Sequence, residues 1–115
     1  MDSGGCIFCR IAAKEVPSQI VYEDEDFTAF RDLNPKAPVH VLLVPKKHYS
    51  TLMDFDSDSP AARGLIGAVR KIAESEKIGS DGFRLVVNCG KNAGQEVDHL
   101  HFHILGGRKF NWPPG

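Results

Sequence analysis

The sequence predicts a single α+β domain, in which one long and one short helix accompany a mainly antiparallel sheet of about five strands. Its 115 residues suit one domain, for which about 100–200 residues is usual. Only one stretch carries apolar residues at helical spacing over several turns, whereas short apolar runs bounded by turn residues recur along the chain. The expected order of hairpin, strand, helix and second hairpin favours antiparallel pairing. Residues 1–5 are expected to be mobile.

The first expected element is a short helix within residues 6–14. Ile7, Phe8 and Ile11 lie within one helical turn and therefore share a face. The helix should end before Pro17, because a residue that precedes proline disfavours helical geometry.

Three strands are expected in the middle of the first half. Residues 19–23 and 27–31 are joined by an acidic turn and predict a hairpin. Residues 39–45 are apolar at successive positions apart from His40, which is typical of a strand covered on both faces. We therefore place this third strand at the centre of the sheet.

The long helix is expected to begin at residues 58–60, where Asp or Ser caps it and Pro takes its first position. Gly79 is placed at a left-handed C-terminal cap. Gly64 and Gly67 are tolerable inside the helix if it lies close against the sheet. The apolar residues at helical spacing are Ala62, Leu65, Ile66, Val69, Ile72 and Ala73.

The last hairpin is expected from residues 83–88 and 100–105, and its second strand carries three alternating histidines, His99, His101 and His103. Side chains alternate along a strand, so the imidazoles lie on one face about 6.6 Å apart and the apolar residues between them face the core. A solvent-facing strand would accept any polar residue and does not account for repeated imidazole. Two chemical interpretations remain: a shared catalytic zinc, or one nucleophilic histidine whose neighbours orient the substrate.

The loop before these histidines favours a substrate that contains phosphate. Gly90, Ala93 and Gly94 leave the backbone free to turn N–H groups toward an anion, and Gln95 adds a side-chain amide. An ordinary long hairpin turn is the alternative. The chain has neither a P-loop nor a dinucleotide-binding fingerprint.

Charge and composition argue against nucleic acid and membranes as partners. The net charge is −1, without a basic excess. No apolar run approaches the ~18 residues of a membrane span. The three cysteines, with no signal peptide at the N-terminus, indicate a reducing compartment. We expect a cytoplasmic protein, with a nuclear pool if its source is eukaryotic.

The chain resembles the histidine triad (HIT) superfamily. The run HLHFHIL at residues 99–105 matches its signature of three histidines separated by apolar residues. Further similarity extends from Cys6 to the end of the chain and includes residues 29–32 and 44–48. The ending WPPG at residues 112–115 is similar to the Hint branch, the histidine triad nucleotide-binding or protein kinase C-interacting proteins.

The resemblance implies a HIT-like fold, a homodimer, and hydrolysis of purine nucleoside phosphoramidates such as AMP linked to an amine. It implies that His101 is the nucleophile and forms a nucleotidyl-histidine intermediate, supported by His40. His103 and the backbone N–H groups near Gly94, Gln95 and Glu96 would then bind the phosphoryl oxygens. The expected nucleoside-binding residues are Phe8, Ile11, Phe30, Asp32, Leu33 and Asn88, with Asp32 on the ribose and Asn88 on the ribose or the phosphate.

Glu96 departs from the animal members of the branch, which have Ser at this position. A carboxylate repels a phosphate unless it is protonated or turned away. Either the Glu96 backbone N–H therefore keeps the role, or its side chain assists amine departure or positions a cationic amine.

The pair Cys6 and Cys9 is by itself compatible with a redox dithiol, half of a metal site or a buried apolar pair. Several HIT relatives build a structural zinc site from this pair and two histidines. The resemblance therefore implies zinc held by Cys6, Cys9, His48 and His99, with Cys89 as a spare thiol. No organic cofactor is expected.

Three alternatives to a phosphoramidate hydrolase stay open. One is a dinucleoside polyphosphate hydrolase of the Fhit type. Another is a zinc hydrolase in which His99, His101 and His103 activate water. The third is a nucleotide-binding regulatory protein whose hydrolysis is incidental.

Overall fold

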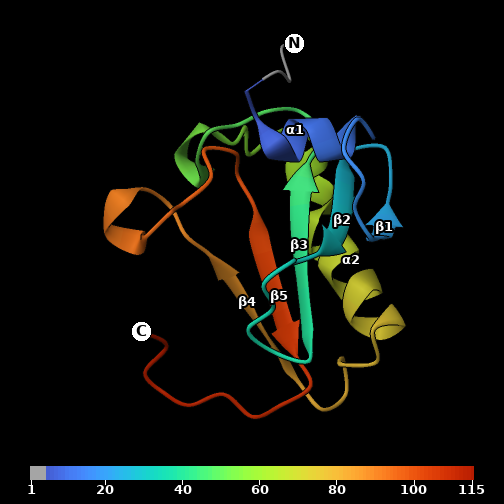
Figure 1. Cartoon of the computed structure of the whole chain (residues 1–115), viewed down its shortest axis with the longest axis vertical. Coiled ribbons are helices and arrows are strands. Elements are labelled where there is room, and N and C mark those ends of the chain that lie inside the picture. Colours follow the sequence, from blue (N-terminus) through green and yellow to red (C-terminus); the bar gives the residue numbers. More distant parts are fainter. Residues whose placement is uncertain (1–4) are drawn as a thin grey trace.

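The computed structural model describes residues 5–115; of the stretch expected to be mobile, residues 1–4 lie outside the described part. Within residues 5–115 the chain forms one antiparallel sheet with the strand order β1-β2-β3-β5-β4 (Figure 1). The predicted α+β class is therefore confirmed. The strands are β1 (Ile20–Glu23), β2 (Phe27–Arg31), β3 (Val39–Pro45), β4 (Phe83–Val87) and β5 (Phe102–Gly106). The helices are α1 (Ile7–Ala12) and α2 (Pro60–Ser75), with short 3-10 turns at Leu52–Asp54 and Lys91–Ala93.

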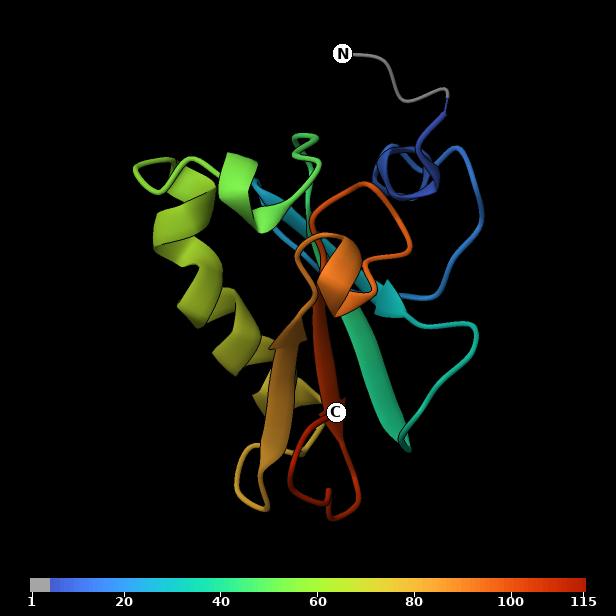
Figure 2. The ribbon, with the colours of Figure 1, turned by 90° about the vertical axis from the view of Figure 1, so that its left-hand side faces the viewer.

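The two helices lie on opposite faces of the sheet (Figure 2). α2 covers one face, and between them lies the main core, which includes Phe27, Val41, Leu43 and Ile72. α1 lies at one end of the other face, where Phe8 and Ile11 pack against β2 and β3 in a second, smaller cluster. β3 is buried along nearly all its length, as expected of the central strand. No helix among the described residues has both the length and the apolarity that a membrane crossing requires.

The start of α2 is as predicted, because the Ser59 side chain accepts a hydrogen bond from the Ala62 N–H and Pro60 takes the first turn. The prediction of Gly79 as the left-handed cap is wrong. The helix ends earlier, and Lys77 takes the left-handed conformation with φ of 61°. The Ile78 N–H then bonds to the Ala73 carbonyl, and the Ile78 side chain is buried, which together form a Schellman cap.

The outer side of α2 also differs from the prediction. Ile66 is 61% exposed, while Ala61 and Ala68 face the core. Gly64 and Gly67 have nothing within 4 Å of the position of a Cβ atom. Close packing against the sheet therefore does not explain these glycines, and the buried stripe of the helix is narrower than its apolar sequence suggested.

The histidine-bearing segment has the expected alternation, although β5 begins two residues later than predicted. Leu100, Phe102 and Ile104 enter the core under α2. His101 and His103 line the opposite side of the sheet, near α1. The alternation thus separates the packing residues from the chemically active ones.

Candidate functional site

A cavity of about 460 Å³ lies on the α1 side of the sheet. Its size falls in the range of about 300–1,000 Å³ that is usual for small-molecule sites. The predicted residues on its wall are Phe8, Ile11, Phe30, Asp32, Leu33, Asn88, Gly94, Glu96, His101 and His103. Gln95 and His40 do not line it. Residues from α1, β2, β3 and the loop before β5 thus converge on one pocket.

Part of the pocket wall is apolar and suits a flat ring. The rings of Phe8 and Phe30 lie 5.5 Å apart, and Ile11 and Leu42 are buried beside them. Leu33 is 98% exposed at the rim. Leu42 was not predicted, although it lies two residues after His40 and so on the same face of β3.

His101 is held in one tautomer. Its Nδ1 lies 2.7 Å from the carbonyl oxygen of His99, and a carbonyl can only accept, so Nδ1 carries the proton. The Nε2 atom of the neutral ring then keeps a free lone pair. Because His101 lines the pocket with its own backbone as the partner of Nδ1, its Nε2 is suited to act as a nucleophile.

His103 is held in the other tautomer, with its proton on Nε2, by a hydrogen bond from His40. The Lys36 N–H donates to Nδ1 of His40 at 3.0 Å, so the proton of neutral His40 lies on Nε2. That Nε2–H donates to Nδ1 of His103 at 2.9 Å, which leaves the His103 proton on Nε2. The two pocket histidines therefore offer a lone pair at His101 and an N–H donor at His103.

Burial keeps His103 and His40 neutral. It lowers the pKa of His103 to about 4, with further lowering from His101 and His40. Burial also lowers the pKa of His40, against the opposing effect of Asp32, whose Oδ2 lies 3.4 Å from the His40 Nε2. The tautomers of His40 and His103 given above are thus the states expected at neutral pH.

The loop before β5 differs in detail from the expected anion-binding nest. The Gly94 N–H donates to the Lys91 carbonyl, and the Gln95 N–H donates to that of Gly90. Neither amide is free for a phosphate in this conformation. Among the described residues the Glu96 N–H has no hydrogen-bond partner, so it is the backbone donor that remains.

The Gln95 side chain braces the loop rather than facing the pocket. Its oxygen accepts from the Gly90 N–H at 2.8 Å, and its nitrogen donates to the carbonyls of Ser50 and Val97. Gly90 and Gly94 have φ of 84° and 79°, which explains glycine at both turns.

The three histidines do not share a metal. His99 directs Nδ1 toward the cysteines, His101 directs Nδ1 to a carbonyl, and His103 directs Nδ1 to His40. The hypothesis of a zinc hydrolase built on these three residues is therefore wrong.

A different cluster fits a metal closely. The ligand atoms of Cys6, Cys9, His48 and His99 all lie within 4.8 Å of one another. The Nε2–H of His99 donates to the Pro45 carbonyl at 2.9 Å, which turns the Nδ1 lone pair toward the two sulfurs. Two thiolates and two imidazoles are a usual donor set for a closed tetrahedral zinc site, and this outer hydrogen bond is typical of metal-bound histidine.

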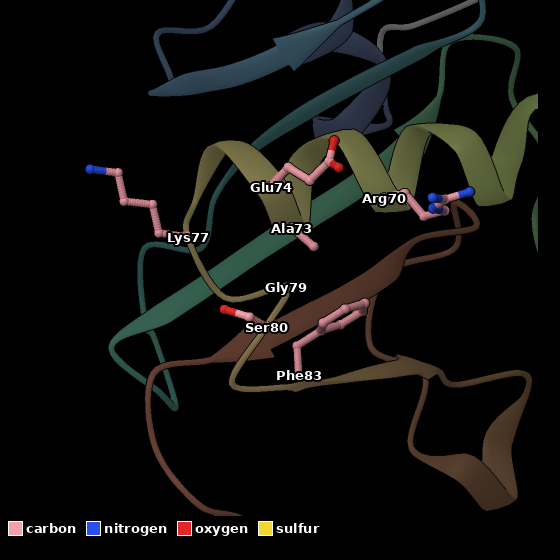
Figure 3. A pocket seen from close by; sticks show the side chains of 7 residues that line it. All are labelled: Arg70, Ala73, Glu74, Lys77, Gly79, Ser80 and Phe83. Atoms are coloured by element: carbon pink, nitrogen blue, oxygen red, sulfur yellow. The ribbon is translucent and has the colours of Figure 1, made fainter.

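A second hollow, of about 590 Å³, lies between the end of α2 and β4. Figure 3 shows that Glu74, Lys77 and Arg70 point in different directions, and that Phe83 lies on the β4 side of the hollow. Its lining contains no histidine or cysteine. Its charged side chains do not point toward one another, so they do not form a common site.

Comparison with known proteins agrees with this site. The sequence pattern of the HIT domain matches residues 13–110. The purine nucleoside phosphoramidase of Escherichia coli K12 is 47% identical over 89% of this chain and 87% of its own. A HIT family hydrolase from Legionella pneumophila superposes with a TM-score of 0.91 at 46% identity, covering 96% of this chain and 100% of its own. A zinc-bound histidine triad protein from Mycobacterium smegmatis gives 0.81 at 32% identity, covering 96% and 81%.

Proposed function

The chain belongs to the HIT family, and we propose that it is a purine nucleoside phosphoramidate hydrolase, which cleaves the P–N bond between a nucleoside monophosphate and an amine. The observation that carries the proposal is the tautomer of His101, whose Nδ1–H is held by the His99 carbonyl and whose Nε2 lone pair is free in the pocket. The similarity to the E. coli phosphoramidase supports the choice of bond.

The reaction proceeds in two displacements. The Nε2 atom of His101 attacks phosphorus, the P–N bond breaks, and the amine leaves with a proton taken from water. A nucleotidyl-histidine intermediate results. Water then attacks phosphorus and gives up a proton to the hydroxide that the first step left, which releases the nucleoside monophosphate and restores His101. The Nε2–H of His103 stabilises charge on the phosphoryl oxygens in both steps.

The nucleoside part of an AMP–amine conjugate would occupy the apolar wall. Phe8, Ile11 and Phe30 are available to pack on the purine, and Leu33 covers it from the rim. Asp32 and Asn88 line the same cavity and supply polar contacts for the ribose and phosphate. Asp32 already accepts the Asn34 N–H on Oδ1 at 2.8 Å, so its Oδ2 is the freer oxygen for a hydroxyl.

A zinc ion would serve structure rather than chemistry. Cys6, Cys9, His48 and His99 come from α1, from the segment after β3 and from the segment before β5, so a bound ion would tie these three parts together. The zinc-bound relative from M. smegmatis supports this assignment.

A homodimer is supported by the exposed side of the sheet. β4 is an edge strand, and Phe83 and Leu85 on it are 37% and 40% exposed. Leu85 pairs with core residue Ile104, so both face the α2 side of the sheet. An unpaired edge with apolar side chains is the kind of surface that a second copy covers.

The decisive experiment compares AMP-linked amines with diadenosine polyphosphates as substrates for the wild-type protein and for His101→Ala. We expect faster turnover of the amines, label from the α-phosphate trapped on His101, and a fall in kcat of about 10³-fold or more in the variant. Faster cleavage of the polyphosphates would favour the Fhit-type alternative. Nucleotide binding without turnover would favour a regulatory binding protein.

A further inference from the structure

Apart from the histidines, charged side chains line the nucleotide pocket at three positions, Arg31, Asp32 and Glu96. Arg31 is neutralised by Glu76, to which it donates two hydrogen bonds of 2.8 and 3.0 Å. Asp32 faces His40 and the Asn34 N–H. The pocket therefore neutralises the charge of Arg31, whereas Asp32 keeps its negative charge but has the Asn34 N–H as a hydrogen-bond donor.

Glu96 is the one of these three charged residues that has no partner among the described residues. Its carboxylate forms no ion pair and no hydrogen bond with any residue in the described part of the chain. It is exposed, and it lies in the segment that leads into His101. It also lines an adjoining hollow of about 530 Å³, which it shares with Ile7 and Val97. Glu96 therefore stands at the rim between the reaction site and open solvent.

A substrate held as proposed above would bring its leaving group toward this rim. The nucleoside occupies the apolar wall, and phosphorus must lie beside Nε2 of His101. The leaving group departs on the side of phosphorus away from the nucleophile, as an in-line displacement requires. What leaves is thus the part of the substrate that reaches outward, toward the rim where the unpartnered Glu96 carboxylate lies.

We propose that Glu96 selects the leaving group by its charge, so that amines with an additional positive charge are preferred and anionic leaving groups are rejected. This inference rests on the proposed function and specifies its substrate class. The Glu96 carboxylate should also slow the cleavage of dinucleoside polyphosphates, because the group that they expel is a nucleotide with several negative charges. A departing amine that takes up a second proton from water becomes an ammonium ion, which the same carboxylate stabilises.

The size of the effect follows from the wet position of the carboxylate. The Glu96 carboxylate and a leaving-group charge would lie about 6 Å apart at a solvated rim. One unit of leaving-group charge should then change the rate of P–N cleavage by about three- to tenfold at low ionic strength. Added salt screens such a pair over about 8–10 Å, so the preference should shrink as salt is raised.

The test uses AMP joined to three amines of similar length: 1,2-diaminoethane, propylamine and β-alanine, which leave a cationic, a neutral and an anionic tail. For the wild type we expect kcat/KM to fall in that order by about three- to tenfold per step. Glu96→Gln should bring the three values together, and Glu96→Lys should reverse their order. Glu25 is an exposed carboxylate that lies outside the nucleotide pocket and forms no ion pair with any described residue. Glu25→Gln should therefore keep the wild-type order.

Four outcomes would overturn the inference. If Glu96→Gln leaves the ratios unchanged, or if Glu25→Gln alters them equally, Glu96 does not select by charge. If the wild type cleaves all three phosphoramidates at similar rates, the inference alone fails. If the wild type cleaves none of them, the proposed function fails and takes this inference with it.

Discussion

The Nε2 atom of His40 lies 2.9 Å from Nδ1 of His103, and these two rings lie on neighbouring antiparallel strands, β3 and β5. Because the Lys36 N–H occupies the other nitrogen of His40, the polarity of the pair is fixed. His103 must therefore present an N–H to the pocket, which is the state needed to bind an anionic oxygen.

Replacing His40 should impair His103 without touching the substrate. His40→Phe keeps the volume of the buried ring but removes the donor, so the His103 proton can move to Nδ1. We expect kcat to fall about 10- to 100-fold with little change in KM, as for other supporting hydrogen bonds. His40→Gln, whose amide can donate to Nδ1, should recover part of the loss. Nitrogen NMR would report the His103 tautomer, and an unchanged tautomer in His40→Phe would contradict this explanation.

Acid should destabilise the protein through His103. Its pKa in the folded protein is about 4, below the ordinary value of 6.5. Burial is the main cause; His101 and His40 lower the pKa further, and Asp32 opposes the shift. Between pH 6.5 and about 4 the unfolded chain takes up a proton that the folded chain refuses. The stabilisation is thus complete above pH 6.5 and is lost as the pH falls through this window.

We expect the loss from this histidine to be about 1–3 kcal/mol in the free energy of unfolding, after allowance for its partial exposure. Urea unfolding of the wild type and of His103→Asn across this range measures it. The variant should show the shallower dependence on pH. Equal slopes in the two proteins would show that His103 does not titrate differently on folding.

The alternation of residues 99–104 made most of the site predictable. A period of two places imidazoles and apolar side chains on opposite faces of the sheet, whatever the exact start of the strand. The late start of β5 at Phe102 therefore did not change which face each side chain was predicted to occupy. The cap at Ser59 is likewise a local signal, because it depends on a side chain and an amide three residues apart.

What the sequence did not predict depends on contacts between distant segments. Nothing near Gln95 indicates that its side chain reaches the Ser50 carbonyl, 45 residues earlier. The Lys36 amide could not be predicted as the partner of His40, because every residue except proline has a backbone N–H and the residue type does not mark the donor. Ile66 lies on the exposed side of α2, and periodicity along the helix cannot show which part of its apolar face the sheet covers.

Zinc binding should be stoichiometric and independent of catalysis. We expect one ion per chain by elemental analysis, retained in His101→Ala and lost in Cys6→Ser, because only the latter removes a ligand. Chelation should lower Tm, since an ion that binds only the folded protein stabilises it by mass action, by about 4 kcal/mol at a concentration of about 1,000 times Kd. Full stability after complete removal of metal would contradict a structural role for this cluster.

Leu85 should control self-association. It projects from the edge strand β4 on the α2 side of the sheet, where no described segment covers it fully. An arginine there would bring an unpaired charge into an interface formed by two copies, which costs far more than its exposure on a monomer. Light scattering after gel filtration should therefore show a dimer for the wild type and a monomer for Leu85→Arg. Met53→Arg is the matched control, because Met53 is 83% exposed in the 3-10 turn at Leu52–Asp54. A dimer that survives Leu85→Arg would place the interface on another face, whereas loss of the dimer in both variants would point to a general effect of added charge.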